Sequence, residues 1–282
     1  MKLMMFEAEG SPRLGVVDGN VVADVSAAGY PDLEAVMAEG TKALDAVRAQ
    51  AGSAPTRPLT DVRPALPIPS PRKFVCVGLN YALHAREGGH DMPTYPSFFL
   101  RVPTSLVAAE APVVLPRASA QLDYECELAI VVGKRGRHIS EADALGHVFG
   151  YTAFNDVSVR DFQRKTSQWT PGKNFDGTGP LGPWVVTADA LPPGASGLRI
   201  TTRVNGETMQ DSNTEDMIFS TARIISLLSE FMTLEPGDII ATGTPSGLAH
   251  ARKPPAWMKS GDIVEVEIEG IGVLRNPIVA ED

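Results

Sequence analysis

Leu122-Asp-Tyr-Glu-Cys-Glu-Leu-Ala-Ile-Val-Val132 joins a long apolar run to three carboxylates that occupy alternate positions. Because successive side chains of a strand point to opposite faces, Asp123, Glu125 and Glu127 should share one face of a single strand. Stacked carboxylates beside a buried run repel one another, and a divalent cation is the simplest compensation. Hard oxygen ligands favour Mg²⁺, Mn²⁺ or Ca²⁺. The stretch therefore predicts a metal site on a strand, and a solvated acidic strand face is the alternative.

The composition of the 282 residues narrows the classes of function. The net charge is −9 and no Lys/Arg-rich run is present, so we expect neither a nucleic-acid partner nor binding to an anionic membrane surface. No apolar stretch reaches the roughly 20 residues that span a bilayer, and residues 1–10 lack the apolar core of a signal peptide. Cys76 and Cys126 both lie in apolar runs, which predicts a reduced, cytoplasmic protein.

A linker divides the chain into two parts. Short apolar runs alternate with turn residues over residues 1–25, and a helix candidate follows over residues 31–50, where Gly40 can interrupt the helix. Residues 51–71 are rich in Pro, Ala and Ser, which is typical of a linker. We therefore expect a small N-terminal α+β domain over residues 1–69, without catalytic residues of its own.

Strand-like runs dominate residues 70–282, which we expect to form the catalytic domain. The exception is a long helix over residues 216–231, with apolar side chains on one stripe and Thr214 as its expected N-cap. Few βαβ units and many Gly/Pro turns favour a mixed sheet rolled on itself over a doubly wound fold. We predict an α+β, mainly β protein whose large domain is a mixed β-roll.

A second group of polar residues follows a strand that ends near Asp156. Arg160 and Gln163 lie four and seven residues further on, so a short helix would place them on the same face as Asp156. A metal ligand beside a guanidinium and an amide suits a carboxylate substrate. A capped surface helix with an Asp–Arg pair is the alternative.

A histidine and a glutamate form a third group. His84 and Glu87 are three residues apart, so one helical turn would pair an imidazole with an orienting carboxylate, as general-base catalysis requires. Gly88-Gly89 can act as a hinge for a lid that extends to Pro96. An ordinary surface His–Glu pair is the alternative. Four other histidines show no partner spacing, and we expect structural or surface roles for them: His90, His138, His147 and His250.

Two glycine-rich segments form the fourth group. Residues 169–183 place Lys173 on a tight loop, and residues 241–247 follow a strand and contain Thr244. Glycine lets the backbone approach a small ligand closely. Neither segment matches a phosphate-binding loop, and each could be an ordinary turn.

Together and in this order, the motifs resemble the fumarylacetoacetate hydrolase family. The resemblance extends from about Lys73 to Pro277 and rests on Glu125-Cys-Glu127, Asp156, Arg160-Asp-Phe-Gln163, Lys173 and Thr242-Gly-Thr244-Pro. It implies a β-roll of the family's C-terminal type with Mg²⁺ or Mn²⁺ as cofactor, or Ca²⁺.

The resemblance also implies roles for single residues. Glu125, Glu127 and Asp156 would be the metal ligands, and Asp123 would lie behind them. The keto-acid end of the substrate would contact Arg160, Gln163, Lys173 and Thr244. His84 and Glu87 match the dyad of members that hydrolyse or decarboxylate acylpyruvates, and Lys173 would balance charge during catalysis.

The activity implied is hydrolysis of a C–C bond in an acylpyruvate-type 2,4-dioxo acid, such as fumarylpyruvate, maleylpyruvate or acetylpyruvate, to pyruvate and a carboxylic acid. The alternative is an oxaloacetate decarboxylase, or an isomerase or decarboxylase of the 5-carboxymethyl-2-hydroxymuconate type, acting through the same metal enolate in aromatic-acid breakdown. A non-catalytic metal-binding protein is a third hypothesis. The expected partners are a small-molecule keto acid and a second copy of the chain in a homodimer.

Overall fold

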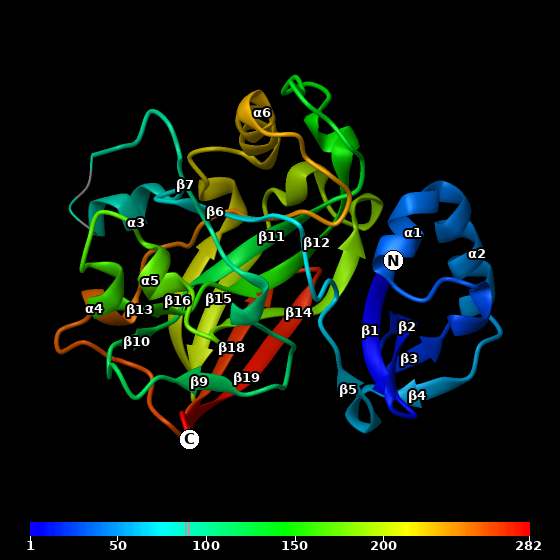
Figure 1. Ribbon diagram of the computed structural model, residues 1–282, viewed down its shortest axis with the longest axis horizontal. Coiled ribbons are helices and arrows are strands. Elements are labelled where there is room, and N and C mark those ends of the chain that lie inside the picture. The colour runs from blue at the N-terminus through cyan, green and yellow to red at the C-terminus, as the bar shows by residue number, and fades with distance from the viewer. Residues whose placement is uncertain (88, 90) are drawn as a thin grey trace.

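The computed structural model in Figure 1 describes residues 1–87, 89 and 91–282. Among these residues the largest sheet contains twelve strands. In spatial order its main path is β4 (Thr56–Pro58), β3 (Val21–Asp24), β2 (Ser11–Asp18), β1 (Lys2–Ala8), β14 (Gly179–Thr187), β12 (Val148–Asn155), β11 (Cys126–Val132), β17 (Ile239–Ala241), β6 (Phe74–Gly78) and β7 (Ser97–Leu100), with β5 (Arg63–Pro64) on β1 and β8 (Leu106–Val107) on β14.

A second sheet packs against the large one. Its strands in spatial order are β16 (Glu207–Asn213), β15 (Arg199–Val204), β18 (Ile263–Ile268), β19 (Gly272–Ala280) and β9 (Val113–Leu115). Both sheets contribute to one apolar core, which includes Leu128 and Ile130 of β11, Ile200 of β15 and Val266 of β18. The β6–β17, β8–β14 and β9–β19 pairs are parallel, whereas the β11–β12 and β18–β19 pairs are antiparallel. The predicted mainly β, α+β fold with mixed sheets is confirmed.

The N-terminal strands extend the large sheet. Strand β1 pairs with β14, with Lys2 opposite Val186. The N-terminal strands are therefore part of the same hydrogen-bonded sheet as β14. Leu3 and Leu14 also share an apolar core with Phe74 and Ile239. Figure 1 shows this part at one end of the molecule, with its helices beside its strands. The domain boundary at residue 69 stays a prediction.

The two N-terminal helices are separated at the predicted glycine. Helix α1 (Leu33–Glu39) and helix α2 (Thr41–Ala51) meet at Gly40, whose φ of 61° is a backbone angle that glycine adopts readily. Asp32 caps α1, because its side chain accepts a hydrogen bond from the backbone N–H of Ala35.

The long helix of the second part is shorter than predicted. Helix α6 (Thr221–Phe231) begins after Ser220, whose side chain accepts a hydrogen bond from the Arg223 N–H, so the prediction of a helix from residue 216 with Thr214 as its N-cap is wrong. Thr214–Asp216 instead form a short 3-10 helix, and the buried side chain of Asn80 holds the residues just before α6. Asn80 accepts a hydrogen bond from the backbone N–H of Phe219 at 2.7 Å.

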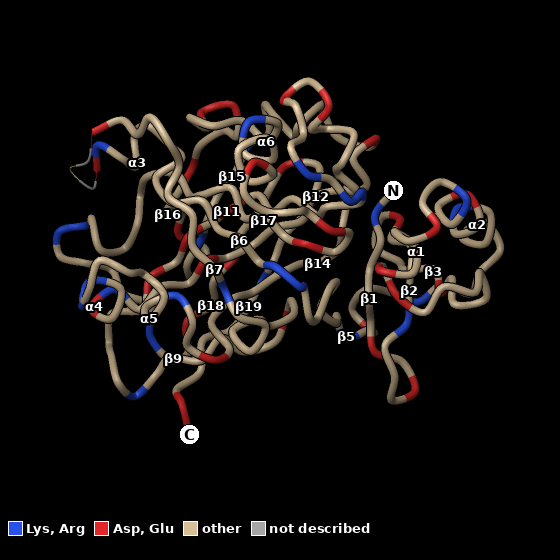
Figure 2. Tube along the Cα trace, turned by 45° about the horizontal axis from the view of Figure 1, so that its top comes forward, with Lys and Arg blue, Asp and Glu red and all other residues tan. Residues whose placement is uncertain are grey.

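None of the helices in the described ranges is both long and apolar enough to cross a membrane. Figure 2 shows acidic and basic residues interspersed in both the N-terminal part and the rest of the molecule. The net charge of −9 is therefore not confined to one part of the fold.

A prediction about the sheet concerns Gly150, which lies opposite Thr187 in the β12–β14 ladder. A Cβ atom at Gly150 would clash with the backbone oxygen of Val186. We expect Gly150→Ala to lower the free energy of unfolding by about 1–3 kcal/mol, because the sheet must shift to accept the methyl group. Urea denaturation measures the change.

The matched control is Gly146→Ala, where a Cβ atom meets no heavy atom within 4 Å. Its free energy of unfolding should stay within about 0.5 kcal/mol of the unaltered protein. Equal stability of the two variants would contradict the β12–β14 register.

Candidate active site

The acidic stretch forms two strands and not one. Strand β10 (Leu122–Asp123) pairs with β13 (Ser158–Val159), whereas β11 begins at Cys126 and pairs with β12. At the break, the Glu125 N–H donates to the side-chain oxygen of Asn155 at 2.9 Å, and the Asp156 N–H donates to the Glu125 carbonyl at 2.9 Å. The prediction of one continuous strand is therefore wrong.

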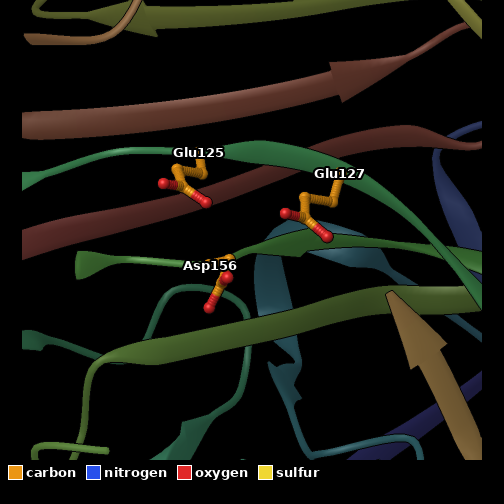
Figure 3. Close-up of side chains that lie close together, drawn as sticks. All are labelled: Glu125, Glu127 and Asp156. Carbon is orange, nitrogen blue, oxygen red and sulfur yellow. The ribbon is translucent and has the colours of Figure 1, made fainter. Parts of the chain in front are cut away.

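Three carboxylates meet at this break. The three residues are buried, and each offers one carboxylate oxygen to the group: Glu125, Glu127 and Asp156. These three oxygen atoms lie within 4.8 Å of one another. Figure 3 shows the three carboxylates close together, Glu125 and Glu127 from one stretch of the chain and Asp156 from a neighbouring one. An all-oxygen set of this kind could hold Mg²⁺, Mn²⁺ or Ca²⁺.

Lysine and arginine contact two of these three carboxylates. The Lys173 Nζ atom lies 2.8 Å from Glu125 Oε2 and 2.6 Å from Asp156 Oδ2. The Arg160 Nη2 atom lies 2.6 Å from Glu125 Oε1. Burial favours the neutral form of Glu125, but Lys173 and Arg160 outweigh it and hold the pKa of Glu125 below its usual value.

Glu127 has a different environment. Its Oε2 atom accepts a hydrogen bond from the Gly243 N–H at 2.9 Å, and within the described ranges no lysine or arginine forms an ion pair with it. Burial, followed by the charges of Asp156 and Glu125, raises the pKa of Glu127 well above its ordinary value. A cation placed among the three carboxylates would remove this penalty.

Arg160 reaches the site by a route other than the predicted one. It begins helix α4 (Arg160–Gln163), but strand β13 separates this helix from Asp156, so the expected common helical face is wrong. The Arg160 Nε atom donates to Asp123 Oδ2 at 2.8 Å and Nη1 donates to Gln163 Oε1 at 2.8 Å. Asp123 therefore lies behind the three carboxylates and orients Arg160.

Lys173 and Thr244 also face the cavity. Lys173 ends the short helix α5 (Thr170–Lys173), so its predicted position on a loop is wrong. Burial alone would lower the pKa of Lys173, but Asp156 and Glu125 raise it overall, which keeps the ammonium charged. Thr244 follows β17 and accepts a hydrogen bond from Gln210 Nε2 at 2.9 Å through its hydroxyl oxygen.

The predicted dyad lies on helix α3 (Ala82–Glu87). The His84 Nδ1 atom is 3.7 Å from Glu87 Oε2, which is too long for a hydrogen bond. Glu87 instead accepts a hydrogen bond from the Gly247 N–H at 3.0 Å. His84 lines the cavity. Two residues of the predicted hinge and lid, Gly88 and His90, lie outside the described residues.

Arg101 is a site residue that the sequence analysis missed. Its buried guanidinium donates from Nη1 to Asp156 Oδ1 and from Nη2 to Thr178 Oγ1, the latter at 2.9 Å. Asp156 is 55 positions away in the chain, so no local spacing indicates the contact. The available signal was an arginine directly after the strand-like run that ends at Leu100.

His250 is a second residue whose position at the cavity the sequence analysis missed. It lines the cavity, and its Nδ1 atom lies 2.9 Å from Asp123 Oδ2. The two residues are 127 positions apart, so their contact leaves no spacing pattern.

The cavity has a volume of about 430 Å³. The three carboxylates, Arg160, Gln163, Lys173 and Thr244 form its polar side, and Val77, Leu79, Phe99 and Trp169 contribute an apolar wall. The rings of Phe99 and Trp169 meet edge to face with centroids 5.4 Å apart. The arrangement suits a small anion with one polar, metal-chelating end.

Known proteins share this sequence pattern and this fold. The family described as fumarylacetoacetate (FAA) hydrolase C-terminal matches residues 73–279. Oxaloacetate tautomerase FAHD2A, mitochondrial, of Bos taurus is 44% identical over 290 residues, which cover 99% of this chain and 92% of the relative.

Two solved structures cover 100% of this chain and are themselves covered completely. Fumarylacetoacetate hydrolase from psychrophilic Exiguobacterium antarcticum has a TM-score of 0.87 at 40% identity. Maleylpyruvate hydrolase from Sphingobium sp. SYK-6, in complex with manganese (II) ion and pyruvate, has a TM-score of 0.85 at 31% identity. The chain therefore belongs to the fumarylacetoacetate hydrolase family of enzymes.

Proposed function

We propose that this enzyme binds one divalent metal ion, Mg²⁺ or Mn²⁺, through Glu125, Glu127 and Asp156 and acts on a small 2-oxo acid. The observation that carries the proposal is the convergence of three buried carboxylates on one cavity, with no lysine or arginine paired to Glu127 in the described part of the chain. Hard oxygen donors fit both ions. A neighbour of the same fold is in complex with manganese (II) ion and pyruvate, which is itself a 2-oxo acid.

The charge balance around the cavity also favours a divalent cation. Four buried carboxylates face three buried cationic side chains: Asp123, Glu125, Glu127 and Asp156 against Arg101, Arg160 and Lys173. When Glu127 is ionised, as a metal ligand must be, the excess of one negative charge without a cation would repel an anionic substrate. A divalent cation would reverse the sign of this balance and so favour binding of a 2-oxo acid.

The residues of the chain would divide the remaining tasks. When bound, the metal would polarise the 2-oxo group and stabilise the negative charge that develops on it. Lys173 has three N–H donors, of which Glu125 and Asp156 take two, so one remains for an oxygen of the substrate. Gln163 and Thr244 line the cavity and would orient the carboxylate of the substrate, with Arg160 beside them.

The first candidate reaction is keto–enol tautomerisation of oxaloacetate. Its support is the 44% identity along 99% of the chain to a protein named oxaloacetate tautomerase. In this reaction the C3–H bond breaks, its electron pair forms the C2=C3 double bond, and the 2-oxo oxygen gains a proton. His84 with Glu87 could take the proton from C3, and the charged Lys173 could donate to the oxygen.

The second candidate is the C–C hydrolysis of an acylpyruvate that the sequence analysis placed first. Its support is the likeness in fold to a maleylpyruvate hydrolase, at 31% identity. Here His84 and Glu87 would activate a water molecule for attack on the C4 carbonyl. Decarboxylation of oxaloacetate and isomerisation of a hydroxymuconate would use the same charged groups. We place tautomerisation first because identity to the tautomerase is higher.

A panel of substrates with Mg²⁺ or Mn²⁺ tests this order. We expect the enol absorbance of oxaloacetate to relax fastest, and deuterium from the solvent to enter C3 without release of pyruvate or CO₂. Acetylpyruvate, fumarylpyruvate, maleylpyruvate and a hydroxymuconate form the other arms. A higher kcat/KM for cleavage of any acylpyruvate would favour the hydrolase, and no turnover in any arm would contradict the proposed chemistry.

The metal site can be tested without turnover. Free Mn²⁺ at about 100 times its Kd should raise the free energy of unfolding by about 2.7 kcal/mol. The reason is that an ion that binds only the folded state shifts the folding equilibrium by an amount set by the ratio of its concentration to Kd. Glu127→Gln should abolish this stabilisation. Without metal the variant should unfold no earlier than the unaltered protein, because it removes a buried and poorly compensated anion.

Asp211→Asn is the matched control, since Asp211 is an exposed carboxylate paired with Arg199 at 2.7 Å. Its Mn²⁺-dependent shift in Tm should equal that of the unaltered protein. An undiminished shift in Glu127→Gln would contradict the proposed ligand set.

The dyad can be tested by a double-mutant cycle. Replacing His84 or Glu87 by Ala should lower kcat by about 10²–10⁴, while the Mn²⁺-dependent shift in Tm survives. Because the two residues would act as one unit, the double variant should be little worse than the worse single variant. Additive losses in kcat would show that they act independently.

The homodimer and the cytoplasmic location stay predictions. Cys76 and Cys126 are buried and unpaired, which suits a reducing compartment. A light-scattering mass near the 30.0 kDa of one chain would contradict the dimer.

A further inference from the structure

We propose that His250 determines specificity by binding a second carboxylate of the substrate, at the end remote from Glu125, Glu127 and Asp156. This inference rests on the proposed function and makes it more specific, since it assigns the enzyme to 2-oxo dicarboxylates. The evidence is the fixed orientation of one imidazole on the cavity wall, which Asp123 holds through one ring nitrogen.

The orientation of the His250 ring follows from its contact with Asp123. The Nδ1 atom lies 2.9 Å from Asp123 Oδ2, and an ionised carboxylate can only accept, so Nδ1 carries a proton. Asp123 is fully buried and also accepts hydrogen bonds from Arg160 Nε at 2.8 Å and from the Ala249 N–H at 2.8 Å. These donors keep it ionised and fixed in place. The ring therefore cannot exchange its two nitrogens without losing this contact.

The remaining nitrogen is available to a ligand. With Nδ1 engaged, Nε2 is the polar atom that His250 can offer to the cavity that it lines. The side chain is 16% exposed, and no hydrogen bond from Nε2 to another described residue is present. Nε2 therefore accepts a hydrogen bond when the ring is neutral, and it can donate one to a ligand carboxylate when the ring carries a second proton.

Two other basic groups of the cavity, Arg160 and Lys173, are already engaged with carboxylates. Arg160 contacts Asp123, Gln163 and Glu125, and Lys173 contacts Glu125 and Asp156. Both lie against the metal-binding carboxylates, so they can serve the 2-oxo acid end of the substrate. A second carboxylate would need a different cation, and the cavity lining offers His250, held in place by Asp123, and the exposed Arg164.

Two carboxylates lie beside His250. Asp123 is in contact with the ring, and Glu87 is near enough for its charge to interact with that of His250. The same loop holds both carboxylates, because the Gly247 N–H donates to Glu87 and the Ala249 N–H donates to Asp123. A doubly protonated ring could donate to Asp123 through Nδ1 and to a substrate carboxylate through Nε2.

Two ligands of four carbons provide a matched test. Oxaloacetate and 2-oxobutyrate share the 2-oxo acid group, and only oxaloacetate has a carboxylate at the far end. Their Kd values are measured by calorimetric titration of the Mg²⁺-loaded enzyme with freshly dissolved ligand. We expect His250→Asn and His250→Leu to raise the Kd for oxaloacetate about 10-fold or more, as for loss of a charge-assisted hydrogen bond. The Kd for 2-oxobutyrate should stay unchanged.

The two variants separate recognition from structural support. Asn retains a donor for Asp123 but does not reach as far into the cavity, so it keeps the test valid even if the Leu variant fails to fold. His147→Asn is the control, because that ring is engaged with the Lys134 carbonyl at 3.0 Å and does not line the cavity. It should leave both Kd values unchanged.

The outcomes distinguish this inference from the proposed function. If both ligands bind the unaltered enzyme and the His250 variants weaken them equally or not at all, His250 does not recognise the far carboxylate. If Arg164→Gln, a change of an exposed residue on the cavity wall, abolishes the preference instead, Arg164 is the recognising group. If the unaltered enzyme binds neither ligand, the proposed function itself is wrong.

Discussion

The site depends on the compensation of buried charge. Four carboxylates and three cationic side chains lie together out of contact with bulk water, and removing a charge from water is costly unless a partner of opposite sign is in place. The partners come from distant segments, since Arg101 follows β7, Arg160 begins α4 and Lys173 ends α5. The folded sheets must therefore bring three separate cations to one acidic centre. The unmatched carboxylate, Glu127, is what makes a metal ion fit there.

The break in the acidic stretch gives this charge cluster its shape. Strands β10 and β11 pair with different segments, so the sheet opens between Asp123 and Cys126. Glu125 lies at the opening, Asp156 lies opposite it, and Asn155 satisfies the backbone N–H that leaves the ladder. The break therefore places Glu125 beside Asp156.

Two carboxylate–histidine pairs meet one loop beside this cavity. The Gly247 N–H holds Glu87, and the Ala249 N–H holds Asp123. The pairs differ in rigidity: His84 and Glu87 are 3.7 Å apart and lie on a short helix, whereas His250 and Asp123 are 2.9 Å apart and Asp123 is fully buried. A loosely held pair suits a group that exchanges protons, and a firmly held one suits recognition.

Much of the fold class and of the ligand set followed from local patterns. Alternation of apolar residues marks strands in any context, Gly40 interrupts a helix by its own backbone freedom, and carboxylates on alternate positions repel unless a cation is near. Of the ligand set, Glu125 and Glu127 belong to the acidic pattern, whereas the set with Asp156 was implied by the family resemblance, and the structure brings these three together. The start of α6 was not predictable in this way, because Asn80, from a distant part of the chain, accepts a hydrogen bond from the backbone N–H of Phe219 just before the helix.

Arg101 and His250 belong to the part that only the tertiary structure decided. Their carboxylate partners are 55 and 127 positions away, and a single side chain in contact across such a separation produces no periodicity. Local interactions specify which residues can form a strand or a helix, because neighbours in sequence are neighbours in space. Which distant charge compensates another depends on how the sheets pack, and that packing is a property of the whole chain.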